Sequence, residues 1–313
     1  MMREKKVLKR ILVSGVVLGV FAGGVLAAGD AGSSAGLVLR LGSGAHGPAM
    51  GDAYTADATG IASLHYNPAG LGFTARGEAG ATYQRLVLDI AQGDLGFAHP
   101  INSVSAWGIS FNYIDYGKTQ RVTLKDIINN NNPSVTFTGR DLVFGASYGR
   151  QVNSTLSLGV TAKILNSEID NVTATAFAAD VGLSYRPENL PFRLGISGQN
   201  LGTTLKFERV SEDLPALVRG GIAFDFNRVT VAAEVEKVRK QNVTFNGGVE
   251  FRVVDMLALR GGFDGRVDSD NGWTAGLGLN IGDLAVDYAY IPFGNLGNNH
   301  RVALTYQFGP SYK

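Results

Sequence analysis

Apolar and polar residues alternate with a period of two through almost the whole sequence after residue 77. Leu158 and Val160, for example, share one face of their segment, whereas Gly159 and Thr161 share the other. Such alternation indicates β-strands with one apolar and one polar face. Strands are expected at residues 78–84, 90–99, 103–114, 140–150, 155–167, 172–185, 192–201, 215–226, 228–238, 243–253, 256–264, 271–281, 283–291 and 299–309.

The lengths of these segments and of their connections favour a membrane barrel. Most segments have the roughly 9–11 residues that a tilted transmembrane strand requires. Very short connections, such as Asn227 and Gly282, alternate with generally longer ones, such as 115–139 and 202–214. An even strand number with short turns at one end and longer loops at the other is typical of outer-membrane proteins. We therefore predict an all-β fold, a transmembrane antiparallel up-and-down β-barrel of about 14 strands, in the outer membrane of a Gram-negative bacterium.

The polar face of the expected strands carries charges of both signs. Charged side chains that face lipid cost about 2–4 kcal/mol each near the bilayer midplane, whereas charges in a lumen can be hydrated or paired. The apolar face is therefore expected to contact lipid, and a soluble barrel with its apolar face inward is the alternative. The charged residues expected to face the lumen include Lys163, Arg193, Arg219, Glu234, Glu250, Arg252, Arg260, Asp287 and Arg301.

The N-terminus has the pattern of a secretory signal peptide. Residues 1–10 carry five basic residues and one acidic residue, and residues 11–27 are apolar and uncharged, ending on Val-Leu-Ala. This order of a basic region, an apolar region and small residues predicts a signal peptide at 1–27 that is removed on export. An uncleaved anchor is the alternative, although the apolar run lies at the lower limit for spanning a membrane.

Composition excludes several classes of function. The chain contains no cysteine, which excludes disulfides, thiolate metal sites and a cysteine-linked lipid anchor. Without residues 1–27, 23 basic and 26 acidic residues remain. This slightly negative balance gives no general electrostatic attraction to nucleic acid.

The stretch from Arg40 to Gly72 differs from everything that follows it. It is built of small residues, lacks the two-residue alternation, and contains the turn sequence Asn67-Pro68-Ala69-Gly70. Small residues let one backbone pass close to another, and Asn-Pro followed by Gly marks a tight reversal. We expect residues 28–77 to form a plug inside a barrel made by residues 78–313.

Several motifs support this arrangement. Residues 47–54 and 64–71 read Gly-Pro-Ala-Met-Gly-Asp-Ala-Tyr and Leu-His-Tyr-Asn-Pro-Ala-Gly-Leu, and further motifs lie at 137–141, 196–202, 257–262, 286–290 and 296–301. Together they resemble the PorV/PorQ family, a branch of the FadL-like outer-membrane barrels. The resemblance covers nearly the whole mature chain and implies a plug, or hatch, whose movement opens a path. The residues of this plug or gate are then Met50, Gly51, Asp52, Asn67, Pro68 and Gly70.

The resemblance implies two functions of different classes. A FadL-like protein would be a plugged channel for uptake of a small hydrophobic molecule. A PorV-like protein would instead be a non-enzymatic interaction component of type IX protein secretion, with secretion proteins or cargo as partners. In both cases the barrel contacts outer-membrane lipid.

The sequence predicts neither an enzyme nor a cofactor or metal site. Residues 145–149 match the G-x-S-x-G pattern, but they lie within an expected strand rather than at a sharp strand-to-helix turn. Asp264, Asp268 and Asp270 lack the full ligand set of a calcium site. No metal-ligand spacing connects the four histidines, His46, His65, His99 and His300.

Overall fold

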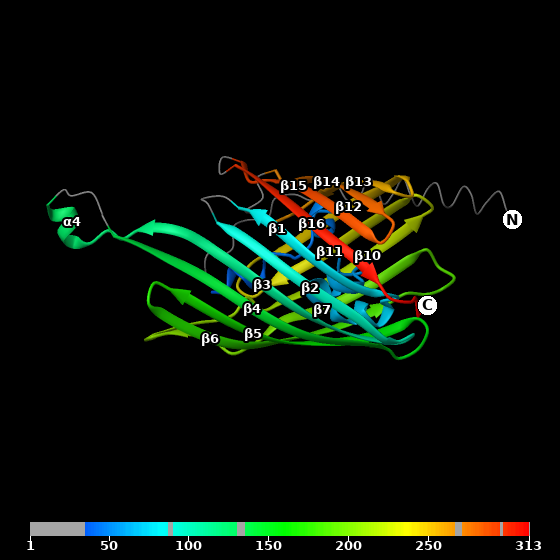
Figure 1. Ribbon diagram of the computed structural model, residues 1–313, viewed down its shortest axis with the longest axis horizontal. Helices are drawn as coiled ribbons and strands as arrows, with labels where there is room; N and C mark the ends of the chain where they lie inside the picture. Colours follow the sequence, from blue (N-terminus) through cyan, green and yellow to red (C-terminus); the bar gives the residue numbers. More distant parts are fainter. Residues whose placement is uncertain (1–34, 87–89, 130–134, 267–270, 295–296, 313) are drawn as a thin grey trace.

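The predicted barrel is confirmed. The computed structural model describes residues 35–86, 90–129, 135–266, 271–294 and 297–312, and within them fourteen antiparallel strands pair in a closed ring (Figure 1). Chain neighbours pair throughout, except that β7 pairs with β10 and β16 closes the ring on β1. The strands are β1 Gly77–Arg85, β2 Ala91–Asn102, β3 Ser105–Gln120, β4 Thr136–Gln151, β5 Leu156–Ile169, β6 Val172–Tyr185, β7 Phe192–Gly202, β10 Leu217–Phe226, β11 Val229–Val238, β12 Val243–Val254, β13 Leu257–Phe263, β14 Trp273–Ile281, β15 Leu284–Pro292 and β16 Asn298–Phe308.

Residues 1–27, the expected signal peptide, lie outside the described residues, as do residues 28–34 of the expected plug segment. Among the described residues, no helix is long and apolar enough to cross a membrane.

The connections sort to the two ends of the barrel as expected. Short turns and the C-terminus lie at one end, here called the periplasmic end, and the generally longer connections lie at the outer end, where the turn at 170–171 is an exception (Figure 1). Two outer connections differ from expectation. β3 and β4 continue well into the expected loop 115–139, and the short helix α4 (Leu124–Ile128) follows β3. The connection after β7 holds a small hairpin of β8 (Leu205–Phe207) and β9 (Val210–Glu212).

A bulge explains why the β3–β4 extension was missed. The register between these strands shifts between Asp115 and Lys118, and Gly117 has a φ of 70°. An inserted residue breaks the alternation on which strand prediction depends, although pairing resumes beyond it. The extended hairpin therefore reads as a loop in the sequence but projects from the barrel as strand.

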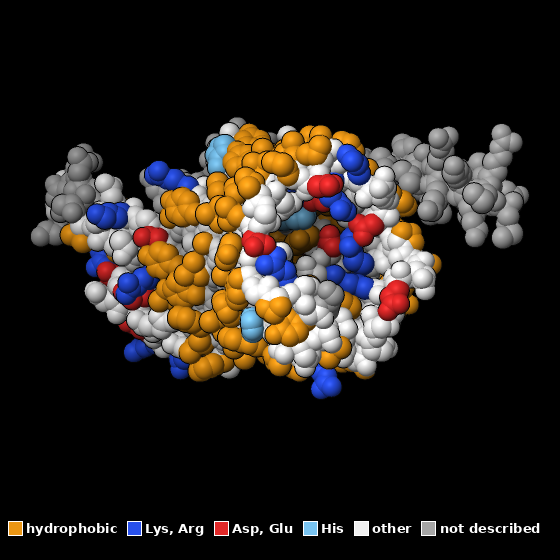
Figure 2. Space-filling model, turned by 45° about the vertical axis from the view of Figure 1, so that its right-hand side comes forward, with side chains coloured by type: hydrophobic (Ala, Val, Ile, Leu, Met, Phe, Trp, Pro, Cys, Tyr) orange, Lys and Arg blue, Asp and Glu red, His pale blue; other side chains and the backbone are white. Residues whose placement is uncertain are grey.

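The apolar face of the strands lies on the outside. Leu158 and Val160 are 48% and 54% exposed, whereas Thr161 on the opposite face of β5 is 2% exposed. Figure 2 shows hydrophobic side chains spread over the outer wall of the barrel. This surface suits contact with the hydrocarbon of a membrane.

Residues 35–73 lie inside the ring of strands (Figure 1). They form short elements, η1 Leu37–Leu39, α2 His46–Ala49, η2 Gly60–Ala62, α3 Ser63–Tyr66 and η3 Pro68–Phe73. The start of η3 is fixed locally, because the Asn67 side chain accepts a hydrogen bond from the Ala69 N–H and Pro68 occupies the first position. Helices this short are not stable alone, so their order depends on the barrel wall.

Candidate functional site

Glycines on the lumen face bring the plug into direct contact with the strands. A Cβ at Gly149 of β4 would lie 2.6 Å from both the Leu71 Cβ and the Pro68 carbonyl oxygen. Because glycine has no Cβ, plug and wall backbones can approach closely here. The same close approach occurs at Gly159, Gly182, Gly195, Gly248 and Gly262. Some of the 42 glycines in the chain therefore serve to seat the plug.

Charged side chains of the wall satisfy backbone groups of the plug. The Glu234 carboxylate accepts hydrogen bonds from the backbone N–H groups of Tyr54 (3.1 Å) and Thr55 (2.8 Å). An N–H group of Arg301 donates to the carbonyl oxygen of Gly42 (2.7 Å). Leaving such buried groups unpaired would cost about 1–3 kcal/mol each. Two of the predicted lumen residues therefore anchor the plug.

Neutral side chains of the wall, which were not among the predicted lumen residues, also form hydrogen bonds to the backbone of the plug. The Gln199 amide donates to the carbonyl oxygens of His65 (2.6 Å) and Tyr66 (2.8 Å), and the Ser157 hydroxyl donates to the carbonyl oxygen of Ala69 (2.7 Å). These residues share the polar, lumen-facing side of the alternation with the charged ones. Their signal in the sequence is therefore the polarity of this face, which neutral side chains share with charged ones.

Asp52 lies in a buried cluster that joins two parts of the plug to the wall. It is 2% exposed with a φ of 65°. Its carboxylate accepts a hydrogen bond from the Tyr66 hydroxyl (2.5 Å) and lies 3.1 Å from a guanidinium nitrogen of Arg266. Burial opposes ionisation, but Arg266 and Arg219 hold the pKa of Asp52 well below its usual range. Burial and the Asp52 charge raise the pKa of Tyr66, which therefore remains a donor.

Met50 and Gly51 form a turn against β12–β14. Met50 is 2% exposed, and its backbone packs on Gly248. Gly51 has a φ of 63°, and its N–H donates to the Thr274 hydroxyl at 3.1 Å. A side chain at Gly51 would collide with the Phe263 backbone, so only glycine fits.

The Asn67-Pro68-Ala69-Gly70 turn is also fully enclosed. The Asn67 amide donates to the carbonyl oxygens of Leu183 (3.0 Å) and Thr55 (3.2 Å), while Pro68 packs on Gly149. A Cβ at Gly70 would collide with the plug's own backbone. All six residues predicted for the plug or gate are described, and their contacts are those of anchors.

Most of the predicted lumen charges form ion pairs. The first group consists of pairs that contact the plug or stabilise the wall around it. Its Arg219 guanidinium also lies over the ring of Tyr66 in the plug, 5.5 Å from the ring centre. The pairs are Lys163–Asp180 (2.6 Å), Arg219–Glu236 (2.8 Å), Arg193–Asp225 (2.8 Å) and Arg193–Asp57 (3.2 Å). These pairs neutralise charge within the enclosed lumen.

A second group of charges surrounds His46 of the plug. Arg260 bridges Glu250 (2.8 Å) and Asp287 (2.6 Å), and Arg252 lies 3.6 Å from Glu250. The His46 Nε2 atom lies 3.2 Å from the Glu250 carboxylate. Burial and the neighbouring Arg260 hold the pKa of His46 well below its usual value, so this contact joins a neutral imidazole to a carboxylate.

One cavity of about 380 Å³ passes this group and extends along the lumen. Its lining begins at Val38 and Leu39 in the outer half and reaches Asp255 and Asn280 at the periplasmic end. In Figure 2 the surface is hollowed at this end, with charged side chains around the rim and a histidine at the base. The six predicted plug or gate residues are absent from its described lining.

The outer end of the cavity is closed by apolar contacts. We define the outer apolar cluster as Val38, Leu39, Ile114, Val143, Leu165, Ala174, Ala176, Leu205 and Leu214. Two hydrogen bonds from the wall to residues 35–41 are long, with the Asn200 amide 3.4 Å from the Leu39 oxygen and the Gln92 amide 3.5 Å from the Leu41 oxygen. Val38 and Leu39 of this segment are therefore held by apolar packing.

The serine of the G-x-S-x-G pattern, Ser147, does not lie at a strand-to-helix turn. Ser147 sits within β4, where its hydroxyl lies 2.8 Å from the Thr161 hydroxyl. The described residues contain no group of three or more His, Cys, Asp or Glu side chains placed to hold a metal ion. Asp268 and Asp270 lie outside the described residues.

Solved structures with the same fold include hydrocarbon transporters. The chain is similar to the toluene transporter TodX of Pseudomonas putida, with 15% identity and a TM-score of 0.64 over 85% of this chain and 98% of that one. It is similar to the toluene transporter TbuX of Ralstonia pickettii, with 16% identity and a TM-score of 0.62 over 86% of this chain and 99% of that one. It is also similar to a FadL homologue of Pseudomonas aeruginosa, with 13% identity and a TM-score of 0.57 over 92% of this chain and 100% of that one. No curated protein matches the chain.

At these identities the solved structures establish the fold alone, a closed antiparallel barrel like theirs. The family is established by a separate match. A family model described as type IX secretion system protein PorV matches residues 32–244, which is more than half of the chain. The chain therefore belongs to the family of the type IX secretion system protein PorV.

Proposed function

We propose that the protein is a plugged, non-enzymatic channel that admits a small hydrophobic molecule across the outer membrane. The observation that carries this proposal is the cavity that runs from Val38 and Leu39 to Asp255 and Asn280. Its periplasmic end is open, so residues 35–41 and the outer apolar cluster close the path. The similar fold of the toluene transporters TodX and TbuX supports an apolar substrate.

The plug combines a firmly anchored part with a weakly held part. Residues 50–73 are fixed by the lumen glycines and by hydrogen bonds from Glu234, Gln199 and Ser157. Val38 and Leu39 are held by apolar contacts, and the hydrogen bonds from Asn200 to Leu39 and from Gln92 to Leu41 are long. Local opening draws on the least stable part of a structure. We therefore assign the gate to residues 35–41, with the rest of the plug remaining in place.

A hydrophobic molecule could replace the gate segment without loss of burial. Removing Val38 and Leu39 from the outer apolar cluster would expose apolar side chains of β3, β4 and β5. Each buried apolar side chain contributes about 1.5–3 kcal/mol. A small apolar ligand on the same surface would offset this cost, so substrate and gate segment compete for one site.

Dye uptake by intact cells tests the proposal. Expression in a Gram-negative host should increase entry of the apolar dye N-phenyl-1-naphthylamine, which an intact outer membrane excludes. Ala285→Trp places a large side chain in the cavity lining and should reduce uptake to the level of cells without the protein. Ala275→Trp on the lipid-facing side of β14 is the matched control and should leave uptake unchanged. Equal uptake by both variants would refute a path through this cavity.

Family membership favours a second candidate, a non-enzymatic interaction component of type IX secretion. The β3–β4 hairpin projects beyond the barrel and carries α4 near its tip (Figure 1). Leu124, Ile127 and Ile128 are 77%, 66% and 80% exposed there. Clustered apolar side chains outside the membrane are typical of surfaces that bind proteins. Such a partner would be a secretion protein or a cargo protein.

Replacing these three residues with serine separates the two candidates. The interaction candidate predicts that export of type IX cargo falls while dye uptake stays at the parental level. The channel candidate predicts no change in cargo export. Heat-modifiable gel migration of the variant confirms that the barrel has assembled in either case.

A further inference from the structure

A groove of about 460 Å³ lies on the outer wall of the barrel near its periplasmic end. It is formed by outward side chains of β4 and β5 and by the turn between these strands. Tyr148, Leu158 and Val160 are 41%, 48% and 54% exposed, so the groove presents apolar surface toward lipid. Arg150 forms its charged edge.

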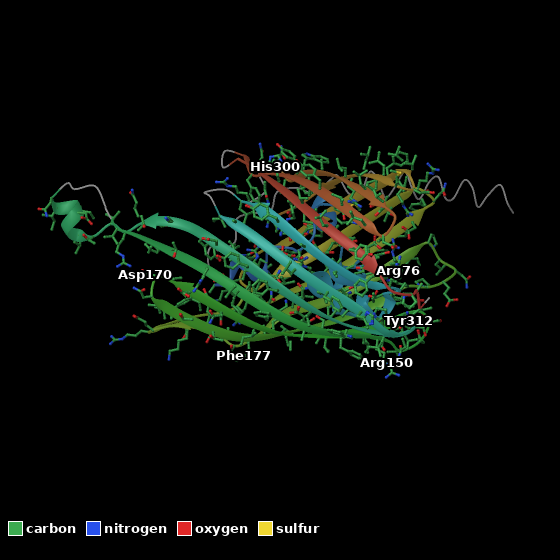
Figure 3. The ribbon with its side chains drawn as sticks, in the orientation of Figure 1. Arg76, Arg150, Asp170, Phe177, His300 and Tyr312 are labelled. Carbon is green, nitrogen blue, oxygen red and sulfur yellow. The ribbon has the colours of Figure 1, made fainter. Side chains whose placement is uncertain are left out.

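Arg150 differs from two other arginines outside the lumen, Arg76 just before β1 and Arg140 on the outer part of β4. Arg76 and Arg140 pair with the carboxylates of Asp283 (2.6 Å) and Glu168 (2.7 Å). The Arg150 side chain points away from the wall (Figure 3), and no carboxylate contacts its guanidinium within the described part of the chain. A guanidinium exposed beside an apolar groove is complementary to a ligand with an anionic head and an apolar body.

The position of Arg150 along β4 sets its depth in the membrane. Tyr148 pairs with Trp107 on β3, and aromatic side chains gather at the membrane–water interface of outer-membrane barrels. Arg150 is two residues closer to the periplasmic end, where β4 stops at Gln151. Its guanidinium therefore lies at the level of the lipid phosphates on the periplasmic side. Guanidinium groups bind phosphate oxygens through paired, charge-assisted hydrogen bonds.

We propose that this groove binds one phospholipid of the inner leaflet of the outer membrane. The phosphate contacts Arg150, and one acyl chain lies along Tyr148, Leu158 and Val160. The site is on the lipid-facing side of the wall and does not depend on passage through the lumen.

Native mass spectrometry of the purified full-length protein in detergent tests this site. Phosphatidylglycerol is added as the probe, and the diacylglycerol with the same acyl chains serves as the lipid without phosphate. We expect one phosphatidylglycerol to bind the parent protein, with about fivefold weaker binding to Arg150→Gln, as for the loss of one basic residue at a lipid surface. Arg140→Gln, at the outer end of the same strand and paired in the parent, should bind like the parent.

Two results would overturn the proposal. Equal phosphatidylglycerol binding by the parent and Arg150→Gln would exclude a phosphate contact at Arg150. Equal binding of diacylglycerol and phosphatidylglycerol to the parent would show that the groove takes up lipid by apolar contact alone. Both substitutions replace a side chain on the outer face of β4, and heat-modifiable gel migration shows whether each variant barrel has assembled.

Discussion

Replacing Gly149 with alanine tests whether close packing against the wall holds the plug. The added Cβ would lie 2.6 Å from Leu71 and Pro68, whereas ordinary contact begins at 3.4 Å. Plug and wall would have to separate by about 0.8 Å, which stretches the neighbouring hydrogen bond from Ser157 to Ala69 beyond its present 2.7 Å. Overpacking of this kind costs about 1–3 kcal/mol. A cost of about 2 kcal/mol lowers the ratio of seated to displaced plug roughly 30-fold.

Single-channel recording in planar bilayers measures this effect. Gly149→Ala should open more often than the parent, or its barrel should lose heat resistance in gel migration. Gly220→Ala is the matched control, because Gly220 also lies within a strand and no described atom is within 4 Å of its would-be Cβ. If Gly149→Ala behaved like the parent, or if Gly220→Ala had the same effect, close packing at Gly149 would not hold the plug.

Three further predictions follow from the same contacts. Ile164→Arg, on the lipid-facing side of β5, should impair assembly by about 2–4 kcal/mol, whereas Thr305→Arg in the cavity lining should assemble, as measured by heat-modifiable migration; the reverse order would contradict the assignment of the faces. Tyr66→Phe removes the hydrogen bond to the buried Asp52 carboxylate and should loosen the plug by about 1–3 kcal/mol, with faster protease cleavage of the plug as the readout. Unchanged cleavage would count against that cluster as an anchor. Burial, together with Arg260 for His46 and Arg219 for His65, lowers the pKa of both plug histidines, so the seated plug favours their neutral forms. Above the ordinary histidine pKa of about 6.5, both histidines are neutral and the seated plug keeps its full stability. As pH falls below this value, the free energy that favours the seated plug decreases by up to about 1.4 kcal/mol per pH unit for each histidine. Conductance should therefore rise between pH 7.5 and pH 5 and lose this dependence in a His46→Gln, His65→Gln variant, and a variant that kept the dependence would exclude these histidines.

The barrel could be predicted because its signals are local. Alternation along each strand reports which face meets lipid, and the connection lengths report which end is which. The prediction failed where a local irregularity intervened, as at Gly117, where a bulge hides the continuation of β3 into the projecting hairpin.

The details of the plug could not be predicted, because they depend on contacts between distant parts of the chain. Glu234 binds the Thr55 N–H across 179 positions, and nothing near either residue specifies the other. The sequence contains Gly149 and Gly159, but it does not show that both strands need glycine because Pro68 of the plug packs against them. The sequence does not single out residues 35–41, which we propose as the gate, for a related reason. Val38 and Leu39 resemble an ordinary apolar segment until the wall residues around them are known.

The most direct test of the channel is to remove the gate segment alone. Replacing residues 37–41 with glycine and serine should leave residues 50–73 anchored, because their hydrogen bonds to the wall do not involve this segment. The measurement is single-channel conductance in planar bilayers, with parental protein in the same lipid. Our account predicts frequent openings through a cavity that already reaches Asp255 and Asn280. A variant that inserts normally but conducts no more than the parent would contradict it.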